Sequence, residues 1–265
     1  MAHDALLQRG PAAWVANGLA TVGYVFMILP TLIVIPVSFN SMNEMTFPPS
    51  HPSFAQYVAY FQDSEWLAAT FLSARLALTT ALLSLGLGIP AAYGLLRSRF
   101  AGQRLVSGLL FSPMLTPVII VALGLFIYFS SLGLASASVP IVLGHTLIAT
   151  PFVIVTAISG LRHVDANLET AGMIMGAGRL HVFRSITLPL LRPTILASGL
   201  FAFLISFDEV IIAFFVGKAD APTLAVRIFA SIQWEISPVI AAISTLLTGL
   251  SLVVCLVAAS LLERK

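Results

Sequence analysis

Long uncharged apolar stretches dominate the pattern of this chain. Between Arg9 and Glu44 there is no Asp, Glu, Lys or Arg, and the same holds between Arg75 and Arg97. A helix rises about 1.5 Å per residue, so about 20 apolar residues span the ~30 Å hydrocarbon core of a bilayer. The hydrophobic runs are continuous rather than alternating, which favours helices over strands. The pattern therefore predicts membrane-spanning helices.

Six spans account for these stretches. The uncharged interval between Arg104 and Arg162 is too long for one crossing and fits two, with a turn in the polar, small-residue segment 130–140. The fifth span contains Asp208 and Glu209. The predicted spans are about residues 15–37, 71–96, 105–129, 140–161, 193–216 and 238–262. They leave residues 162–192 as a long loop between the fourth and fifth spans.

The composition agrees with an integral membrane protein. Hydrophobic residues make up 58% of the 265 residues and charged residues only 9%, whereas about 45–50% and about 25% are usual in soluble domains. So few charges cannot cover the surface of a soluble protein, which excludes a soluble enzyme, a nucleic-acid-binding protein and a disordered chain. Cys255, the single cysteine, indicates neither a disulfide nor a metal cluster. We expect a single all-α transmembrane domain in contact with membrane lipid.

The basic residues indicate the orientation, because Lys and Arg accumulate on the cytoplasmic side of membrane proteins. Ten of the 13 Lys and Arg residues fall on one side of the predicted spans. These ten are Arg9, Arg97, Arg99, Arg104, Arg162, Arg179, Arg184, Arg192, Arg264 and Lys265. Lys218 and Arg227 lie on the other side, and Arg75 lies within a span. We therefore expect both termini and the 162–192 loop to be cytoplasmic.

The 162–192 loop has the pattern of two short helices. Asp165 is suited to cap a helix over residues 166–175, and Gly176 is suited to the left-handed conformation that ends one. A second helix is expected over residues 180–187, ending before Pro189. One face of the first helix has small or flexible side chains, namely Leu168, Ala171, Gly172 and Met175. This hairpin is interpreted as a docking surface for another protein; the alternative is a solvated linker.

The same loop resembles the cytoplasmic signature of the membrane subunits of bacterial ATP-binding-cassette importers, E-A-A-x-x-x-G-x(9)-I-x-L-P. Gly176 is followed at the family's spacing by Ile186, Leu188 and Pro189, and Ala177 comes directly after the glycine. Thr170, Ala171 and Gly172 stand where Glu-Ala-Ala is usual, and Glu169 lies one residue early, as in many spermidine/putrescine-type permeases. The resemblance assigns all nine of these residues to a loop that couples the subunit to an ATPase.

Three further segments, at 206–210, 223–227 and 234–238, also resemble polyamine-type permeases, so the similarity covers nearly the whole chain. It implies the type I importer fold with six spans, in a bacterial inner membrane. It also implies a second related permease subunit, two cytoplasmic ATPase subunits and a periplasmic solute-binding protein. The transported solute would be a polyamine or a related organic cation.

The residues themselves indicate that this chain does not bind ATP. The phosphate-binding pattern G-x-x-x-x-G-K-[ST] does not occur, and the two lysines, Lys218 and Lys265, lie in other contexts. ATP and Mg²⁺ would therefore be bound by a partner, and we expect no catalytic site, cofactor or metal in this chain. The alternative function is a stand-alone channel or secondary carrier, for which the 162–192 loop would have no purpose.

Three charged residues fall within predicted spans: Arg75, Asp208 and Glu209. Intramembrane charges are costly and need partners or water. In a continuous helix Asp208 and Glu209 would point about 100° apart, so they would not share one partner. Two interpretations stay open, namely a structural ion pair with Arg75 and an acidic lining for the pathway of a cation.

Overall fold

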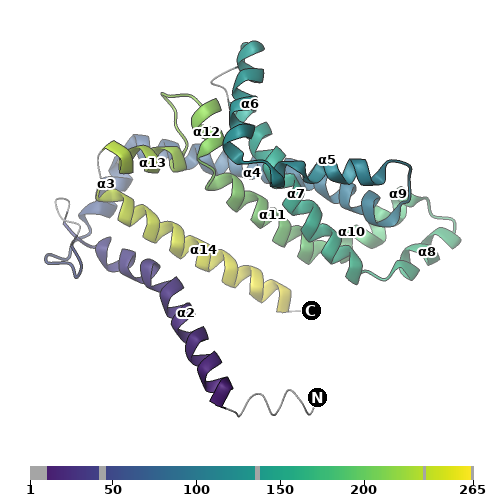
Figure 1. The fold of residues 1–265 in the computed structure, drawn as a ribbon, viewed down its shortest axis with the longest axis horizontal. Coiled ribbons are helices and arrows are strands. Elements are labelled where there is room, and N and C mark those ends of the chain that lie inside the picture. Colours follow the sequence, from purple (N-terminus) through teal and green to yellow (C-terminus); the bar gives the residue numbers. More distant parts are fainter. Residues whose placement is uncertain (1–10, 42–45, 135–137, 235–236, 264–265) are drawn as a thin grey trace. The chain divides into compact units, whose positions relative to one another are not determined.

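The computed structural model describes residues 11–41, 46–134, 138–234 and 237–263, and every regular element in these ranges is helical (Figure 1). The chain divides into two compact units. The first unit combines the described parts of Met1–Asp63 and Ile236–Leu256, and the second comprises Ser64–Glu235 with the last residues of the chain. Each unit is described by itself.

The first unit contains α2 (Pro11–Val37), α3 (Ala55–Gln62) and most of α14 (Val239–Glu263). The two long helices coincide with the predicted first and sixth spans. The buried side chain of Gln56 in α3 donates to the carbonyl oxygens of Val37 and Asn40, at 3.3 and 3.2 Å. Val37 is the last residue of α2, where intrahelical donors are missing, and Asn40 lies in the turn that follows. The short helix α3 therefore closes the C-terminal end of α2.

The second unit is built around α4 (Ser64–Arg97), α7 (Ser138–His163) and α11 (Arg192–Phe207). Glycines allow these helices to approach closely. A Cβ atom on Gly88 of α4 would lie 2.7 Å from Val153 Cγ1 of α7, and a Cβ on Gly160 of α7 would overlap the side chain of Thr194 in α11. Small residues at helix contacts are typical of membrane proteins, where van der Waals packing drives association.

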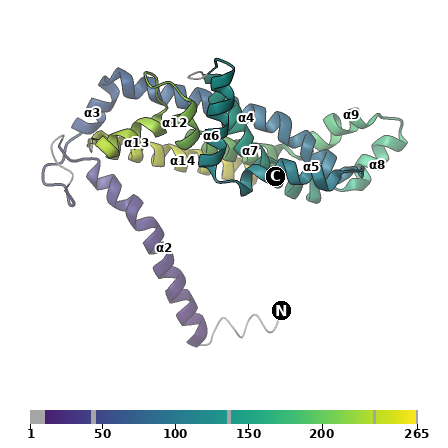
Figure 2. The same cartoon turned by 45° about the horizontal axis from the view of Figure 1, so that its top comes forward.

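Two of the predicted spans are broken helices. The predicted span 105–129 forms α5 (Gln103–Leu115) and α6 (Val118–Ser131), which meet at 103° (Figure 2). Thr116 adopts an extended conformation at the break, as expected of a residue that precedes a proline. The predicted span 193–216 forms α11 and the short helix α12 (Ile211–Val216), which is followed by α13 (Leu224–Trp234).

Helices long and apolar enough to cross a membrane occur in both units. Three pass by length and composition among the described residues, over Trp14–Val37, Ser64–Arg97 and Ser138–His163. Two bent pairs raise the number to five when each pair is taken as one span. The all-helical membrane class is thus confirmed, while the count of six spans and the cytoplasmic location of both termini stay predictions.

Candidate functional site

The predicted hairpin of the 162–192 loop is present in the structure. Its first helix is α8 (Ala166–Ile174), and the carboxylate of Asp165 accepts a hydrogen bond from the Asn167 N–H at 2.9 Å. Gly176 has a φ of +90°, and the N–H groups of Gly176 and Ala177 donate to the carbonyls of Met173 and Gly172. This pair of bonds is a Schellman motif. The predicted cap at Asp165 and the left-handed Gly176 are confirmed.

The second half of the hairpin differs from the prediction that its helix ends before Pro189. The chain continues through α9 (Arg179–Val182), a π-helical segment η1 (Phe183–Thr187) and α10 (Leu188–Leu190). Pro189 lies within this helical run, just after the π-helical segment, so the helix does not end before the proline. The bend comes later, because α9–α10 and α11 meet at 77° at Leu191.

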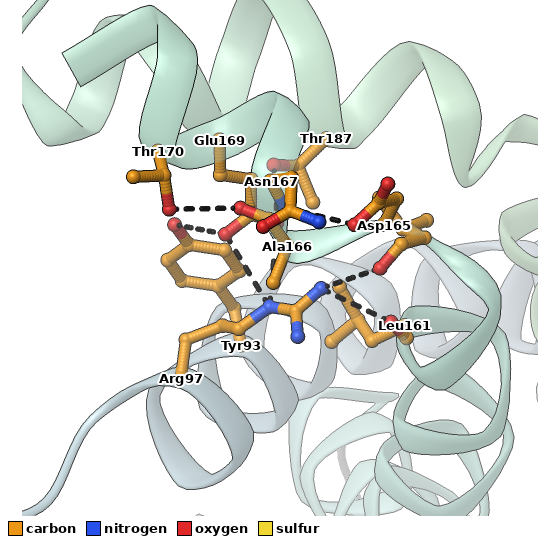
Figure 3. Close-up of polar contacts among 10 residues, drawn as sticks. Tyr93, Arg97, Leu161, Asp165, Ala166, Asn167, Glu169, Thr170 and Thr187 are labelled. Carbon is orange, nitrogen blue, oxygen red and sulfur yellow. Dashed lines mark hydrogen bonds and ion pairs between the residues drawn. The ribbon is translucent and has the colours of Figure 1, made fainter. Parts of the chain in front are cut away.

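Glu169 is the one buried charged residue in the 162–192 loop, with 5% of its surface exposed (Figure 3). Its carboxylate accepts hydrogen bonds from the hydroxyls of Tyr93 at 3.3 Å and of Thr187 at 3.0 Å. The Nε of Arg97 lies 3.3 Å from Glu169 Oε2 and forms an ion pair with it. The carboxylate therefore joins α8 to the end of α4 and to η1.

Arg97, the last residue of α4, extends this network to α7. Its Nη2 donates to the carbonyl oxygens of Leu161 at 3.2 Å and Val164 at 2.8 Å (Figure 3). Carbonyls at a helix C-terminus lack intrahelical partners, and a cation stabilises the negative end of the helix dipole. One guanidinium thus contacts the ends of α4 and α7 together with α8. We call Tyr93, Arg97, Glu169 and Thr187 the clasp.

Sequence reasoning identified only Glu169 among the four clasp residues as part of the coupling loop. From sequence alone, Arg97 is used only as one of the charges that indicate orientation. Tyr93 and Thr187 have no assigned role there. The loop signature itself gives no sign of Tyr93 or Arg97, because both lie at the end of α4, which corresponds to the second predicted span. Thr187 lies between two signature positions, Ile186 and Leu188. A search for a basic residue at the inner end of another span could have identified Arg97 as a partner of Glu169.

The remaining predicted loop residues divide into an inner and an outer set. Gly172 faces inward, because a Cβ there would lie 2.9 Å from Ile186 Cδ1. Ala177, Ile186, Leu188 and Pro189 are half-buried, whereas Thr170 and Ala171 are exposed. The large apolar side chains at the turn are exposed too, with Ile174 at 81% and Met175 at 88%. The predicted face is therefore split, and its exposed part extends over the turn of the hairpin.

The predicted acidic pair lies at the break between α11 and α12. The carboxylate of Glu209 accepts hydrogen bonds from the N–H groups of Ile211, Ile212 and Ala213, at 3.0, 2.7 and 3.2 Å. His145 of α7 lies beside it, with Nε2 3.3 Å from Glu209 Oε2. The other ring nitrogen of His145 contacts a hydroxyl, that of Ser206, at 2.7 Å. Glu209 therefore stabilises the start of α12 within the protein.

Asp208 and Arg75 have different surroundings from Glu209. Both are exposed, and among the described residues neither side chain forms a hydrogen bond or an ion pair. The structure thus separates the two acidic residues and does not pair either with Arg75. Within the described ranges, no group of three or more His, Cys, Asp or Glu side chains could hold a metal ion.

Comparison with known proteins places these features in a family. The model of the family "binding-protein-dependent transport system inner membrane component" matches residues 84–264. The spermidine/putrescine transport system permease protein PotC of Escherichia coli strain K12 is 31% identical over 250 residues, covering 94% of this chain and 93% of that protein. The putrescine transport system permease protein PotI of the same strain is 33% identical over 234 residues, covering 86% and 83%.

Solved structures agree on the fold. A chain of a bacterial importer of the acidic polysaccharide alginate matches with a TM-score of 0.72 at 15% identity, covering 94% of each chain. A chain of the methionine transporter MetNI matches with a TM-score of 0.63 at 16% identity, covering 75% of this chain and 94% of that one. The predicted permease fold is confirmed. The chain belongs to the family of binding-protein-dependent transport system inner membrane components, and is a non-catalytic permease subunit of an ATP-binding-cassette importer in the inner membrane.

Proposed function

We propose that this chain lines the translocation pathway of an importer for a polyamine or a related small organic cation. The observation that supports this most is the identity with the spermidine/putrescine permease, which extends over 94% of this chain. The alginate and methionine transporters support the fold alone, because their identities are 15% and 16%. A periplasmic binding protein delivers the solute, a second related permease completes the pathway, and two ATPase subunits supply the energy.

The ATPase subunits dock on the hairpin of residues 162–192. This assignment is supported by the exposed apolar side chains at its turn, including Ile174 and Met175, since exposed apolar patches in membrane-extrinsic loops favour protein contacts. Ala171 and Thr170 extend the exposed surface along α8. The half-buried signature residues support this surface from behind, namely Gly172, Ala177, Ile186, Leu188 and Pro189. A rigid contact of this kind is needed because the chain itself has no phosphate-binding loop.

The acidic element of the pathway is Asp208. Glu209 has its carboxylate engaged by three backbone N–H groups, whereas Asp208 is exposed and free of intramolecular partners among the described residues. An isolated intramembrane carboxylate requires water or a cation. Arg75, which is also exposed and without a side-chain partner among the described residues, is a second candidate for the lining of the pathway.

Reconstitution of the complete importer tests this function. The chain, its sister permease, the ATPase subunits and the binding protein are placed in lipid vesicles, and uptake of radiolabelled putrescine and spermidine is measured with and without internal ATP. We expect uptake that requires ATP and the binding protein together. Uptake by this chain alone, without ATP, would instead establish a stand-alone channel or carrier. No ATP-dependent uptake of either amine by the assembled complex would reject the cationic substrate.

A further inference from the structure

The coupling hairpin is attached to the membrane helices through bends at both ends. Its first connection follows the end of α7 at His163, and its second is the 77° bend at Leu191. Two bent covalent connections do not by themselves prevent a hairpin from tilting. Force applied to α8 would then be absorbed by rotation of the hairpin, unless side-chain contacts brace it against the membrane helices.

The clasp residues provide such a brace on the face of α8 opposite to its exposed surface. Arg97 contacts α7 through the carbonyls of Leu161 and Val164 and contacts α8 through Glu169. Glu169 in turn accepts from Thr187 in η1 and from Tyr93 in α4. The inner end of α4, the end of α7 and the π-helical segment η1 are therefore all connected to α8 through one buried carboxylate and one guanidinium.

The chemistry of the clasp suits a rigid connection. The side chains of Glu169 and Arg97 are only 6% and 20% exposed, so the pair is largely removed from water and weakly screened by salt. Charge-assisted hydrogen bonds are stronger than neutral ones, and a guanidinium presents its donors in a fixed planar fork. A lysine ammonium is a compact point charge that cannot reach the same carboxylate and both carbonyls in this geometry. The Tyr93 ring also packs against Phe183, with centroids 4.8 Å apart.

We propose that Arg97 is a positioning residue that makes α8 move as one body with the inner ends of α4 and α7. A displacement of α8 by an ATPase subunit is then transmitted to the membrane helices instead of being lost in tilting of the hairpin. This inference rests on the proposed function, because it requires an ATPase that acts on α8.

The substitution Arg97→Lys tests this proposal in the reconstituted importer. Uptake and ATP hydrolysis are measured in the same vesicles, and their ratio reports coupling. We expect the complex to assemble and hydrolyse ATP while uptake per ATP falls about tenfold, the effect of losing one charge-assisted hydrogen bond from a two-state equilibrium. Arg99→Lys is the matched control, because Arg99 is exposed and unpaired among the described residues. We expect its coupling ratio to equal that of the wild type.

Two milder variants keep the proposal testable if Arg97→Lys fails to fold. Thr187→Val removes one hydrogen bond to Glu169 at nearly constant volume, and Tyr93→Phe removes another while retaining the ring. We expect each to lower the coupling ratio with full subunit stoichiometry. If these variants and any assembled Arg97→Lys complex keep the wild-type ratio, the clasp has no role in coupling. A wild-type complex without ATP-dependent uptake would instead reject the proposed function, so the two failures are distinguishable.

Discussion

The substitution Gly176→Val tests whether the shape of the coupling hairpin, rather than its mere presence, is required for transport. Gly176 has a φ of +90°, and no heavy atom lies within 4 Å of the position that a Cβ would occupy. The Cβ of a valine would therefore meet open space outside the turn itself. The whole effect of the substitution comes from the backbone conformation, which β-branched residues strongly disfavour at positive φ.

The size of the expected effect follows from the cost of the backbone conformation alone. A non-glycine residue held in a sparsely populated backbone region costs about 1–3 kcal/mol, which reduces the population of the native turn by about 5- to 150-fold relative to alternatives. The chain escapes this strain by abandoning the left-handed residue. It then loses the bonds from Gly176 N–H to Met173 and from Ala177 N–H to Gly172. The exposed side chains of the turn, Ile174 and Met175, would be displaced with it.

Two measurements on the purified complex report the consequence. The first is co-purification of the ATPase subunits with the permease, and the second is ATP hydrolysis stimulated by the loaded binding protein. We expect Gly176→Val to insert normally, because the membrane helices are untouched, and to lose either ATPase binding or stimulation. Gly176→Asn should have a smaller effect, since asparagine tolerates the left-handed region better.

Gly178 offers a matched control two residues away. A Cβ there also meets open space, but its φ of −67° and ψ of 155° suit an ordinary residue. Gly178→Thr introduces a side chain of the size of valine that is accepted at a helix N-cap, so it should bind and stimulate the ATPase normally. Full stoichiometry and full stimulation in Gly176→Val would refute the argument that the left-handed turn is needed for coupling.

Three further outcomes follow from the structure. Asp208→Asn should lower uptake of a cationic solute severalfold with the complex intact, and unchanged uptake would exclude a role of Asp208 in the pathway. Glu209→Gln should chiefly impair assembly of the complex. Ala171→Asp, an exposed change on α8, should leave insertion unaffected and weaken co-purification of the ATPase, and normal transport would favour the solvated linker. Gly160→Val should lower thermal stability in detergent by about 1–3 kcal/mol through overpacking, and Thr194→Ala should restore part of it.

The features predicted correctly from sequence are those determined by nearby residues. The helix start at Asp165 depends on a hydrogen bond to Asn167, two positions away. The turn at Gly176 depends on the freedom of one glycine and on bonds within five residues. The long helices α4 and α7 follow from uninterrupted apolar runs, whose length alone predicts a crossing. In each case the cause and the effect lie within the same short stretch of chain.

The clasp could not be predicted in this way, because it joins residues that are distant in sequence. Arg97 and Glu169 are 72 positions apart, and their contact depends on how α4 and α7 pack. The close approach that permits this packing is made by small residues such as Gly88, whose role emerges only when Val153 is seen opposite. Glu169 was identified through the family signature, but the signature does not say whether the carboxylate faces a partner or the interior.

The break in the fifth span shows why charge alone does not identify a pathway residue. No proline or glycine lies between Ser206 and Ala213, so no local signal predicts that the helix ends there. Starting a new helix leaves its first N–H groups without acceptors, and burying a carboxylate leaves it without water. Each is costly within a membrane, but Glu209 offsets both by accepting three of those N–H groups. The charge of Glu209 therefore has a structural role at the start of α12. The neighbouring Asp208 has no such role among the described residues, so it is the better candidate for contact with a transported cation.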